Sequence, residues 1–511
     1  MNGPPLQAVA GSRSSSLLKH ITPKKYQGCN LQRSGSWNRP VLDAVRANAQ
    51  DPCSFEKESK GDRKMSFADF REFLAFLETK GELLRIRKEV DPKHEIAAYI
   101  RKTSDIQGPA LYFESVKGSS VPVVGGLFAT TKRLLLALGA PDHAQAVRLL
   151  VESMENPIAP VLVPGGLCKE VVYTGDEVDL GKLPIPTYSS KDGGPFITMG
   201  VAISRDPETR IRNVGLYRLQ VKGKRRLGLN AQQLSQQLYR VEAKNLGVPV
   251  AIAIGTIPEL LIGSQWHAPY GVDELGFACA IHRAPIELTK ATTVDLEVPA
   301  SAEIIIEGTV LPKEREIEGP FGEFTGYYQP AVPKPVIEVT AITHRKRPIY
   351  LAGLTGMPTT DNHVLKQGSI EASYHLALKR NFPGVKAVHV PNCGGANFLL
   401  IVSMKKSQQF EARSLIAAAM SLAGPKYVIV VDDDVDVYDL EKVLWAVSNR
   451  SQPDEDVIML PRLLGAPLDP SARSRRTMSA MGIDATIPLD RPFPDMVEIP
   501  GIEKVPEFWR K

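Results

Sequence analysis

Cysteine is scarce in this 511-residue chain: five residues lie far apart, and no two of them form a C-x-x-C pair. They are Cys29, Cys53, Cys168, Cys279 and Cys393. This odd, scattered set excludes a disulfide framework and a cysteine-based zinc site, so we expect reduced, buried thiols. The nine histidines contain no H-E-x-x-H, and the glycine pairs form neither a G-x-G-x-x-G fingerprint nor a P-loop. No motif therefore indicates NAD or ATP.

Long apolar runs and a net charge on the main body are also missing. Pro258, Glu259 and glycines interrupt the most apolar stretch, VPVAIAIGTIPELLIG, whereas a membrane helix needs about 18 apolar residues in a row. Residues 1–64 hold 11 Lys/Arg and 5 Asp/Glu, which leaves 51 basic and 52 acidic residues in the rest of the chain. Because the main body of the chain is close to neutral, it does not attract nucleic acid, and we expect no nucleic-acid partner. Because its apolar runs are short, we expect no membrane span.

The composition that remains is typical of a globular protein. Hydrophobic residues make up 43% of the chain and charged residues 23%, which excludes a disordered or fibrous protein. At roughly 100 to 200 residues per domain, the length allows two to four domains with cores of their own. A mid-sized enzyme is the default expectation.

Residues 1–64 differ from the rest of the chain. They have no sustained apolar period and carry six basic residues before the first acidic one, Asp43. This composition predicts a disordered basic extension. A plain tail, an organelle transit peptide and a start codon placed too far upstream all remain open. We expect the protein in the cytoplasm, unless a eukaryotic cell uses the extension for targeting.

Met65 opens the part of the chain with clear periodicity. Ser66 and Asp69 resemble a capping box, and Gly81 stands where a helix C-cap glycine belongs. Between them, apolar residues recur at helical spacing, namely Phe67, Phe70, Leu74 and Leu77. The folded chain is expected to begin with this helix.

The pattern changes twice further along the chain. In residues 197–350, β-branched runs alternate with short polar turns such as DPETR and KGKRR, which predicts an antiparallel meander closing into a small barrel or sandwich. After residue 362, helical and strand patterns alternate, as in an α/β domain. The final 40 residues are rich in Pro, Asp and Arg and predict an extended arm with little core.

Three charged residues are candidates for chemistry. Arg218 falls on an apolar face of the strand VGLYRLQV, where a buried guanidinium needs an anionic partner or a cavity. Glu318 and Glu323 flank a Gly-Pro-Phe-Gly turn, across which two carboxylates can share one space. Crowding raises the pKa of one of them, as a general acid near neutral pH requires. The alternatives are a solvent-facing strand end and a hairpin with two surface glutamates.

Two further polar groups have ordinary explanations as well as functional ones. The run DDDVD, with Asp432, Asp433, Asp434 and Asp436, follows a predicted strand. Such carboxylates bind Mg²⁺ or Mn²⁺ or cap the next helix, and we favour the cap. His363, in TTDNHVLKQG just before a predicted helix, is either a pocket residue or a plain loop residue.

Four segments in order carry a family resemblance: MSFADFREFLAFLETKGELLRI, the stretch from GGLCKEVVYTGDE to VKGKRRLG, DLEVPASAEIIIEGTVLPKEREIEGPFGEFTGYY, and KYVIVVDDDVDVYDLEKVLWAVSNR. From Met65 to about residue 490 the chain resembles the UbiD family of reversible, non-oxidative decarboxylases that use prenylated FMN. The resemblance implies a mixed α+β and α/β fold. Its expected parts are a prenylated-FMN-binding domain at 65–361 with a split β-barrel core at about 165–350, a linking helix at 362–381, a C-terminal α/β oligomerisation domain at 382–470 and an extended arm at 471–511.

The resemblance also implies roles for individual residues. Arg218 corresponds to the arginine that holds the substrate carboxylate, Glu318 to the glutamate that orients it, and Glu323 to the acid/base. Asn213 and Glu274 match positions that bind Mn²⁺ or Mg²⁺ at the cofactor phosphate, and K⁺ is a further cofactor candidate. Other cofactor-binding positions implied by the resemblance are Val214, Gly215, Leu216, Tyr217, Arg218, Ser264 and Gln265.

One position departs from the family pattern. The third metal ligand of the family is a histidine, but no histidine occurs between Gly200 and His267. Gln232 or Gln233 takes its place, in a loop that we expect to be shortened. An amide oxygen still binds a hard cation, so we include both glutamines among the cofactor-binding residues.

The activity implied by the resemblance is decarboxylation through a covalent adduct of the substrate with the prenylated flavin, loss of CO₂, and protonation by Glu323. The segments GPFGEFTGYY and NVGLYRLQVKGKRRLG most resemble the phenolic-acid branch of the family, which implies an aromatic or heteroaromatic acid, with an acrylic, cinnamic-type acid as the alternative. A flavin prenyltransferase would supply the cofactor, and a homodimer or larger homo-oligomer is expected. From other classes, a plain-FMN reductase and a catalytically idle scaffold or regulatory member remain open.

Overall fold

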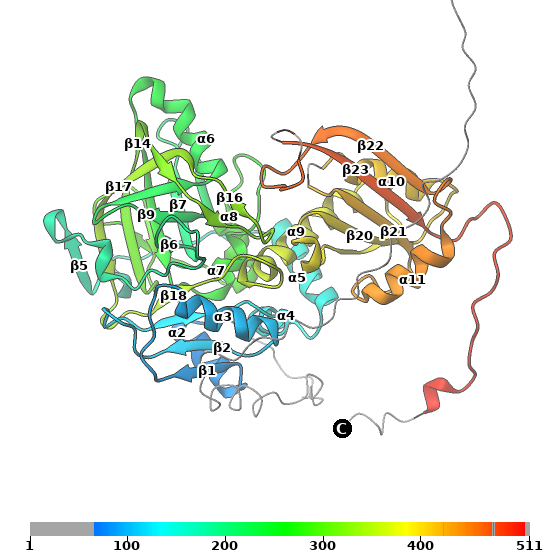
Figure 1. Cartoon of the computed structure of the whole chain (residues 1–511), viewed down its shortest axis with the longest axis horizontal. Helices are drawn as coiled ribbons and strands as arrows, with labels where there is room; N and C mark the ends of the chain where they lie inside the picture. Colours follow the sequence, from blue (N-terminus) through cyan, green and yellow to red (C-terminus); the bar gives the residue numbers. More distant parts are fainter. Residues whose placement is uncertain (1–65, 423, 473, 475, 506–511) are drawn as a thin grey trace, which may run out of the picture. The chain divides into compact units, whose positions relative to one another are not determined.

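The computed structural model describes residues 66–422, 424–472, 474 and 476–505 (Figure 1). The predicted extension at residues 1–64, with Cys29 and Cys53, lies outside the described residues. Within the described part, no single helix is long and apolar enough to cross a membrane. Only the bent pair Thr131–Leu138 and His143–Glu155 meets that test, by length and composition alone.

The first helix of the described chain is α2, Phe70–Thr79. Its N-cap is Asp69, whose carboxylate accepts the N–H of Glu72 at 2.9 Å. The prediction that Ser66 caps this helix is therefore wrong by three residues, because the backbone is still extended at Asp69, whose side chain takes the capping position. Gly81 follows the C-cap with φ of +70°, which confirms the expected helix end.

A mixed four-stranded sheet, with strand order β1-β2-β3-β18, accompanies α2. The pair β2–β3 is antiparallel and the outer pairs are parallel. Because β18 comes from far along the chain, its backbone hydrogen bonds tie the N-terminal segment to later residues. The elements are β1 Leu83–Ile86, β2 Ala110–Phe113, β3 Val123–Gly125 and β18 Tyr350–Ala352, with helices α3 Glu95–Asp105, α4 Thr131–Leu138 and α5 His143–Glu155.

The largest sheet has nine strands, which all pair antiparallel, as expected. Its order is β6-β9-β10-β17-β14-β11-β7-β8, with β5 also bonded to β17. The strands are β5 Val171–Thr174, β6 Phe196–Ile197, β7 Gly200–Arg205, β8 Arg212–Leu216, β9 Arg218–Val221, β10 Arg226–Asn230, β11 Val248–Ile254, β14 Ile304–Glu318 and β17 Val332–His344.

This order corrects the expected closed meander. Only β7–β8 and β9–β10 pair with their neighbours in sequence across short turns, and the path from β6 to β8 stays open among the described strands. Helices separate β10 from β11 and β11 from β14, so these consecutive strands are not joined by short turns. These helices are α6 Gln232–Val241, α7 Pro258–Gly263 and α8 Glu274–His282.

The C-terminal part is an α/β sheet with order β19-β20-β21-β23-β22, as the alternating pattern predicted. Helices α10 and α11 pack against it (Figure 1), and alternate strand residues supply two separate apolar clusters, one with each helix. The elements are β19 Val385–His389, β20 Leu399–Met404, β21 Tyr427–Asp432, β22 Val457–Leu464, β23 Thr477–Ala485, α9 Asp361–Lys379, α10 Glu411–Met420 and α11 Leu440–Arg450.

The expected arm at residues 471–511 is wrong in its first part. Strand β23 is an inner strand, bonded to β21 on one side and to β22 on the other. Its residues are small where a helix covers them: a Cβ added to Gly482 would meet Ile416 of α10 at 2.1 Å. Small residues produce little apolar periodicity, so the pattern predicted no core there. From residue 489 to residue 505, nearly all side chains are exposed.

The acidic run and one cysteine also need correction. The N-cap of α11 is Asp439, not a member of DDDVD. Instead, Asp432 and Asp434 accept hydrogen bonds from the Arg450 guanidinium at 3.1 and 2.6 Å, which gives them a structural role. Cys168 and Cys279 are buried free thiols, as predicted, whereas Cys393 is exposed because it lies in a short loop after β19.

Arg133 of α4 provides a test of how buried charge holds this fold together. Its fully buried guanidinium donates to three backbone carbonyls, those of Gly108, Gly126 and Leu127, and to the Glu82 carboxylate, at 2.8 to 2.9 Å. Arg133→Met leaves the three carbonyls without these donors, and we expect urea unfolding to report a loss of about 3 to 5 kcal/mol.

The neighbouring Lys132 is the matched control for this prediction. Its ammonium also bonds Glu82, at 2.8 Å, but the Lys132 side chain is 40% exposed. Lys132→Met should therefore change the free energy of unfolding by less than about 1 kcal/mol. Equal losses in the two variants would contradict the importance of the buried network.

Candidate active site

Arg218, Glu318 and Glu323 lie together at the ends of two strands. Arg218 is the first residue of β9, and Glu318 is the last residue of β14. The guanidinium donates to both oxygens of Glu318, at 2.8 Å from Nε and 3.0 Å from Nη2, and Nη1 donates to Glu323 Oε1. The two carboxylates thus share one space, as their spacing suggested, and the Glu318 side chain has no exposed surface. Their catalytic roles stay predictions.

The turn between the two glutamates is held by its surroundings. Gln220 accepts the N–H of Gly319 at 2.9 Å, and Gly193 packs so closely that a Cβ there would meet the Gly319 carbonyl oxygen at 2.2 Å. The Arg218 guanidinium lies 4.8 Å from the centroid of the Phe321 ring. A fixed turn and a stacked guanidinium keep the three charged groups in one arrangement, which catalysis by proximity requires.

His363 lies in the first turn of α9, not in the loop before a helix. Its buried ring is bonded to Thr360 Oγ1 through Nδ1 and to the carbonyl of Phe324 through Nε2, both at 2.8 Å. Since a carbonyl only accepts, Nε2 carries the proton and Nδ1 accepts from the hydroxyl. Burial lowers the pKa of His363 to about 3, so the ring is neutral. His363 therefore joins α9 to the residue that follows Glu323.

Lys366 is a second α9 residue at this site, and the sequence pattern did not single it out. One turn after His363, its Nζ lies 3.5 Å from the centroid of the Phe324 ring. Burial lowers the pKa of Lys366 to about 7, although the nearby charge of Glu323 opposes that shift. The sequence contained one signal for Lys366: it follows the candidate His363 by three residues, a spacing that places both on one side of a helix.

Buried polar atoms close to these residues in sequence have no hydrogen-bond partner in the described part of the chain. They are Thr325 Oγ1, Thr355 Oγ1 and Asn362 Oδ1. Buried polar atoms in folded proteins are nearly always bonded, so unpaired ones are typical of a site that a ligand or water completes.

A second group of side chains surrounds the hydroxyl of Tyr217. Asn213 Oδ1 and Gln233 Oε1 each lie 3.1 Å from this hydroxyl, which has a single proton to donate. A Cβ at Gly215 would lie 2.5 Å from the same oxygen, so only glycine leaves room for the tyrosine. Two carbonyl oxygens that converge in this way are also well placed to bind a cation.

Glu274, the first residue of α8, completes this group. Its Oε2 accepts the N–H of Val214 at 3.0 Å, and burial raises the pKa of Glu274 to about 7. A cavity of about 200 Å³ is lined by Asn213, Gln233 and Glu274, together with two arginines, Arg212 and Arg240.

These residues fit the cation and phosphate that the family resemblance implies. Three oxygen donors suit Mn²⁺ or Mg²⁺, and the arginines suit a phosphate. Gln232 and Gln233 form the start of α6 and are not part of a loop, contrary to the prediction, because β10 leads through Ala231 directly into this helix.

The other predicted cofactor positions lie apart from this cavity lining. Val214, Gly215 and Leu216 belong to β8, and the first of them contributes its backbone N–H. Ser264 is the C-cap of α7, and its hydroxyl donates to the Leu261 carbonyl at 2.8 Å. Neither Ser264 nor Gln265 lines the cavity.

The raised pKa of Glu274 predicts a pH dependence for the cation-free protein. The carboxyl titrates at about 7 in the folded state, against an ordinary value of 4.5. Between these values the folded state binds more protons than the unfolded state, so the free energy of unfolding falls as pH rises. We expect Glu274 to contribute a fall of about 3 kcal/mol over this window, measured by urea unfolding. Glu274→Gln, which cannot ionise, should remove most of it, and an unchanged slope would contradict this.

Comparison with known families matches the chain in three successive parts. The N-terminal domain of 3-octaprenyl-4-hydroxybenzoate carboxy-lyase, UbiD, matches residues 74–154. The Rift-related domain of the same family matches residues 161–358, and its C-terminal domain matches residues 363–485.

Solved structures and curated relatives agree with this match. HmfF, a UbiD-class enzyme of Pelotomaculum thermopropionicum solved with FMN, is 42% identical, with 86% of this chain and 99% of HmfF covered and a TM-score of 0.80. The vanillic acid decarboxylase of Sedimentibacter hydroxybenzoicus is 32% identical, with 86% and 98% covered and a TM-score of 0.79. A protein of Archaeoglobus fulgidus is 36% identical over 480 residues, 88% of this chain and 99% of the relative. The chain therefore belongs to the UbiD family of carboxy-lyases.

Proposed function

We propose that this protein is a reversible, non-oxidative decarboxylase of an aromatic or heteroaromatic carboxylic acid, and that it uses prenylated FMN. The observation that carries the proposal is the buried arrangement of one guanidinium between two carboxylates, Arg218 with Glu318 and Glu323. Such a set binds a carboxylate and handles a proton, which hydride transfer by a plain-FMN reductase does not need. A structure of HmfF with prenylated FMN, 40% identical to this chain, supports the choice of cofactor.

Arg218 is the binding point for the substrate carboxylate. Glu318 holds the guanidinium by two hydrogen bonds, which leaves the edge that faces Glu323 to exchange partners. When a substrate carboxylate takes that edge, Glu323 loses its cation and gains a negative neighbour. A carboxyl group released from its cation in this way can carry a proton to the substrate.

Protonated Glu323 then supplies the proton that replaces CO₂. Bound prenylated FMN supplies the electron sink that allows the bond to the carboxylate to break. Asn213, Gln233 and Glu274 would hold the divalent cation at the flavin phosphate, and Arg212 and Arg240 would add positive charge there.

The side chains near Glu323 support a flat substrate. The rings of Phe324 and Phe398 stack with centroids 5.9 Å apart, and His363 and Lys366 add polar groups beside them. Relatives of similar fold are decarboxylases of vanillic acid and, in Enterobacter cloacae, of 3,4-dihydroxybenzoic acid. A cinnamic-type acid is also flat, so this alternative stays open.

We also propose a homodimer or larger homo-oligomer, supplied with cofactor by a flavin prenyltransferase. A dimeric form of HmfF supports the first part. The exposed apolar side chains that follow β23 also support it, because apolar surface of this kind is commonly covered by a second chain. They include Leu489, Met496, Val497 and Ile499.

The cofactor can be tested directly. The full chain is produced together with a flavin prenyltransferase, with and without Mn²⁺, and examined by absorbance spectroscopy and native mass spectrometry. We expect bound prenylated FMN, whose retention depends on the divalent cation. Empty protein under every metal condition would overturn the proposal and favour an idle scaffold.

Glu323→Gln tests the proton donor. Glutamine keeps the shape of the side chain but cannot deliver the proton, so we expect turnover of an aromatic acid to fall by at least about 10² to 10⁴ while flavin binding is unchanged. Glu314→Gln, an exposed glutamate late in β14 that pairs with Arg226, is the control and should keep full activity. Full activity of Glu323→Gln would exclude the assigned role.

A further inference from the structure

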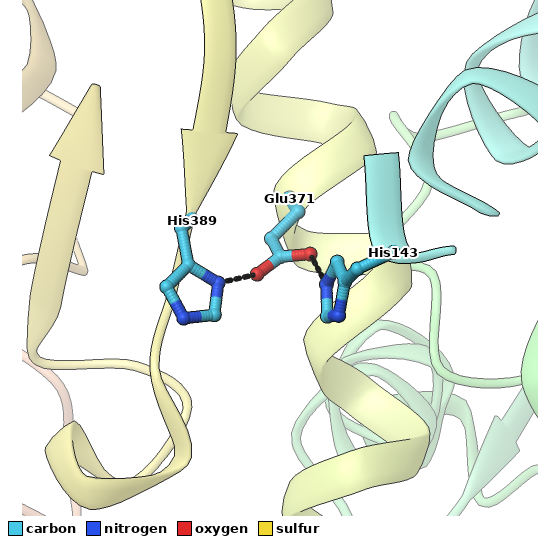
Figure 2. Close-up of side chains that lie close together, drawn as sticks. All are labelled: His143, Glu371 and His389. Carbon is cyan, nitrogen blue, oxygen red and sulfur yellow. Dashed lines mark hydrogen bonds and ion pairs between the residues drawn. The ribbon is translucent and has the colours of Figure 1, made fainter. Parts of the chain in front are cut away.

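A buried group of two histidines and one glutamate lies outside the site described above (Figure 2). His143 is the first residue of α5, Glu371 lies in the middle of α9, and His389 is the last residue of β19. His143 Nε2 lies 2.6 Å from one carboxylate oxygen of Glu371, and His389 Nδ1 lies 2.8 Å from the other. We call these three residues the His143–Glu371–His389 cluster.

The carboxylate of this cluster is oriented by its surroundings. The Glu371 side chain has no exposed surface, and the backbone N–H of Val390 donates to Oε1 at 2.8 Å. Contacts with His143, His389 and the Val390 N–H therefore hold the carboxylate in one direction.

The donor atoms converge as the ligands of a metal ion do. One ligand atom from each residue can be chosen so that all three lie within 4.8 Å of one another. The Glu371 carboxylate lies between the two rings, with one oxygen turned to His143 Nε2 and the other to His389 Nδ1 (Figure 2). Zinc holds nitrogen and oxygen ligands about 2.0 to 2.2 Å away, so the three ligand atoms need to come only slightly closer together than the present 4.8 Å limit to share one ion.

We propose that the His143–Glu371–His389 cluster binds a divalent transition metal ion, and that the ion is Zn²⁺. Two imidazoles and one carboxylate are a donor set that zinc accepts, with a fourth position left for water. A metal ion binds only an unprotonated ring nitrogen. Each neutral imidazole can therefore bind the ion through the nitrogen that faces Glu371, with its proton on the other ring nitrogen. The Tyr438 ring packs against both histidines, with centroids 4.7 and 5.0 Å away, and covers the cluster.

The ion would join three segments that are far apart in the chain. Its ligands come from α5, from the long helix α9 and from the C-terminal sheet, and the unfolded chain cannot hold them together. Metal binding would therefore stabilise the folded state. This site is separate from the flavin cation site, whose donors are all oxygens, and it does not depend on the proposed decarboxylase activity.

Zinc counting on the full-length protein tests the proposal. Wild type is dialysed against a chelator, loaded with Zn²⁺ at about pH 7.5, passed through a desalting column and measured by elemental analysis, with thermal unfolding in parallel. The zinc count uses a Glu274→Ala background, which removes an oxygen ligand of the flavin site so that zinc bound there is not counted. We expect about one Zn²⁺ per chain in this background, and a Tm that rises when zinc is added.

Ligand variants and a matched control decide the location. His143→Asn and Glu371→Gln should each lose this one equivalent and the zinc-dependent rise in Tm. His282→Asn removes a histidine that contacts a single buried glutamate, Glu259 at 3.4 Å, and should keep both. Circular dichroism checks that each variant is folded. If Glu371→Gln does not fold, His143→Asn decides, because the His143 side chain is partly exposed.

Cobalt gives an independent readout. Co²⁺ bound by imidazole nitrogens absorbs visible light, and the band should appear in wild type and in His282→Asn but not in His143→Asn. No retained zinc and no cobalt band in wild type would overturn the proposal and leave the cluster as a hydrogen-bonded group. Zinc retained equally by the ligand variants would overturn it as well.

Discussion

A single buried guanidinium imposes the central constraint on this protein. The Arg218 side chain is 8% exposed, and an unpaired charge in that position would destabilise the fold by several kcal/mol. Glu318 removes this penalty with two hydrogen bonds, and it reaches Arg218 only because β14 continues for 15 residues to this point. The turn after β14 returns Glu323 to the same cation. The hydrogen bonds that stabilise the buried charge of Arg218 thus also bring the three candidate catalytic residues together.

Helix α9 connects the reactive groups to the rest of the molecule. Its first turns place His363 and Lys366 beside Phe324, and its middle places Glu371 between α5 and β19. The 19 residues of the helix span about 28 Å, long enough to take part in both groups. A change at one end of α9 is therefore expected to reach the other through a rigid element.

The proposed cation site at the flavin phosphate and the proposed site in the His143–Glu371–His389 cluster differ in their ligand atoms. Asn213, Gln233 and Glu274 offer only oxygen, because glutamine stands where the family resemblance implies histidine. Oxygen donors select hard ions such as Mg²⁺ and Mn²⁺, whereas the imidazoles of His143 and His389 favour zinc. The donor types would thus direct different ions to the two proposed sites.

The sequence alone determined the features that depend on local pattern. The apolar period of α2, the antiparallel strands and the alternating C-terminal elements were predictable, because periodicity and turn chemistry record which residues are buried nearby. The pattern also singled out Arg218, Glu318 and Glu323 one by one, but only the family resemblance predicted that they act together, since Arg218 lies 100 and 105 positions from the two glutamates. Strand order, the inner strand β23, the helix that carries Gln233, the placement of Lys366 and the His143–Glu371–His389 cluster were not predictable. Most of these depend on packing between separated segments, from 18 positions for Glu371 and His389 to 228 for His143 and Glu371, and local periodicity carries no record of such partners.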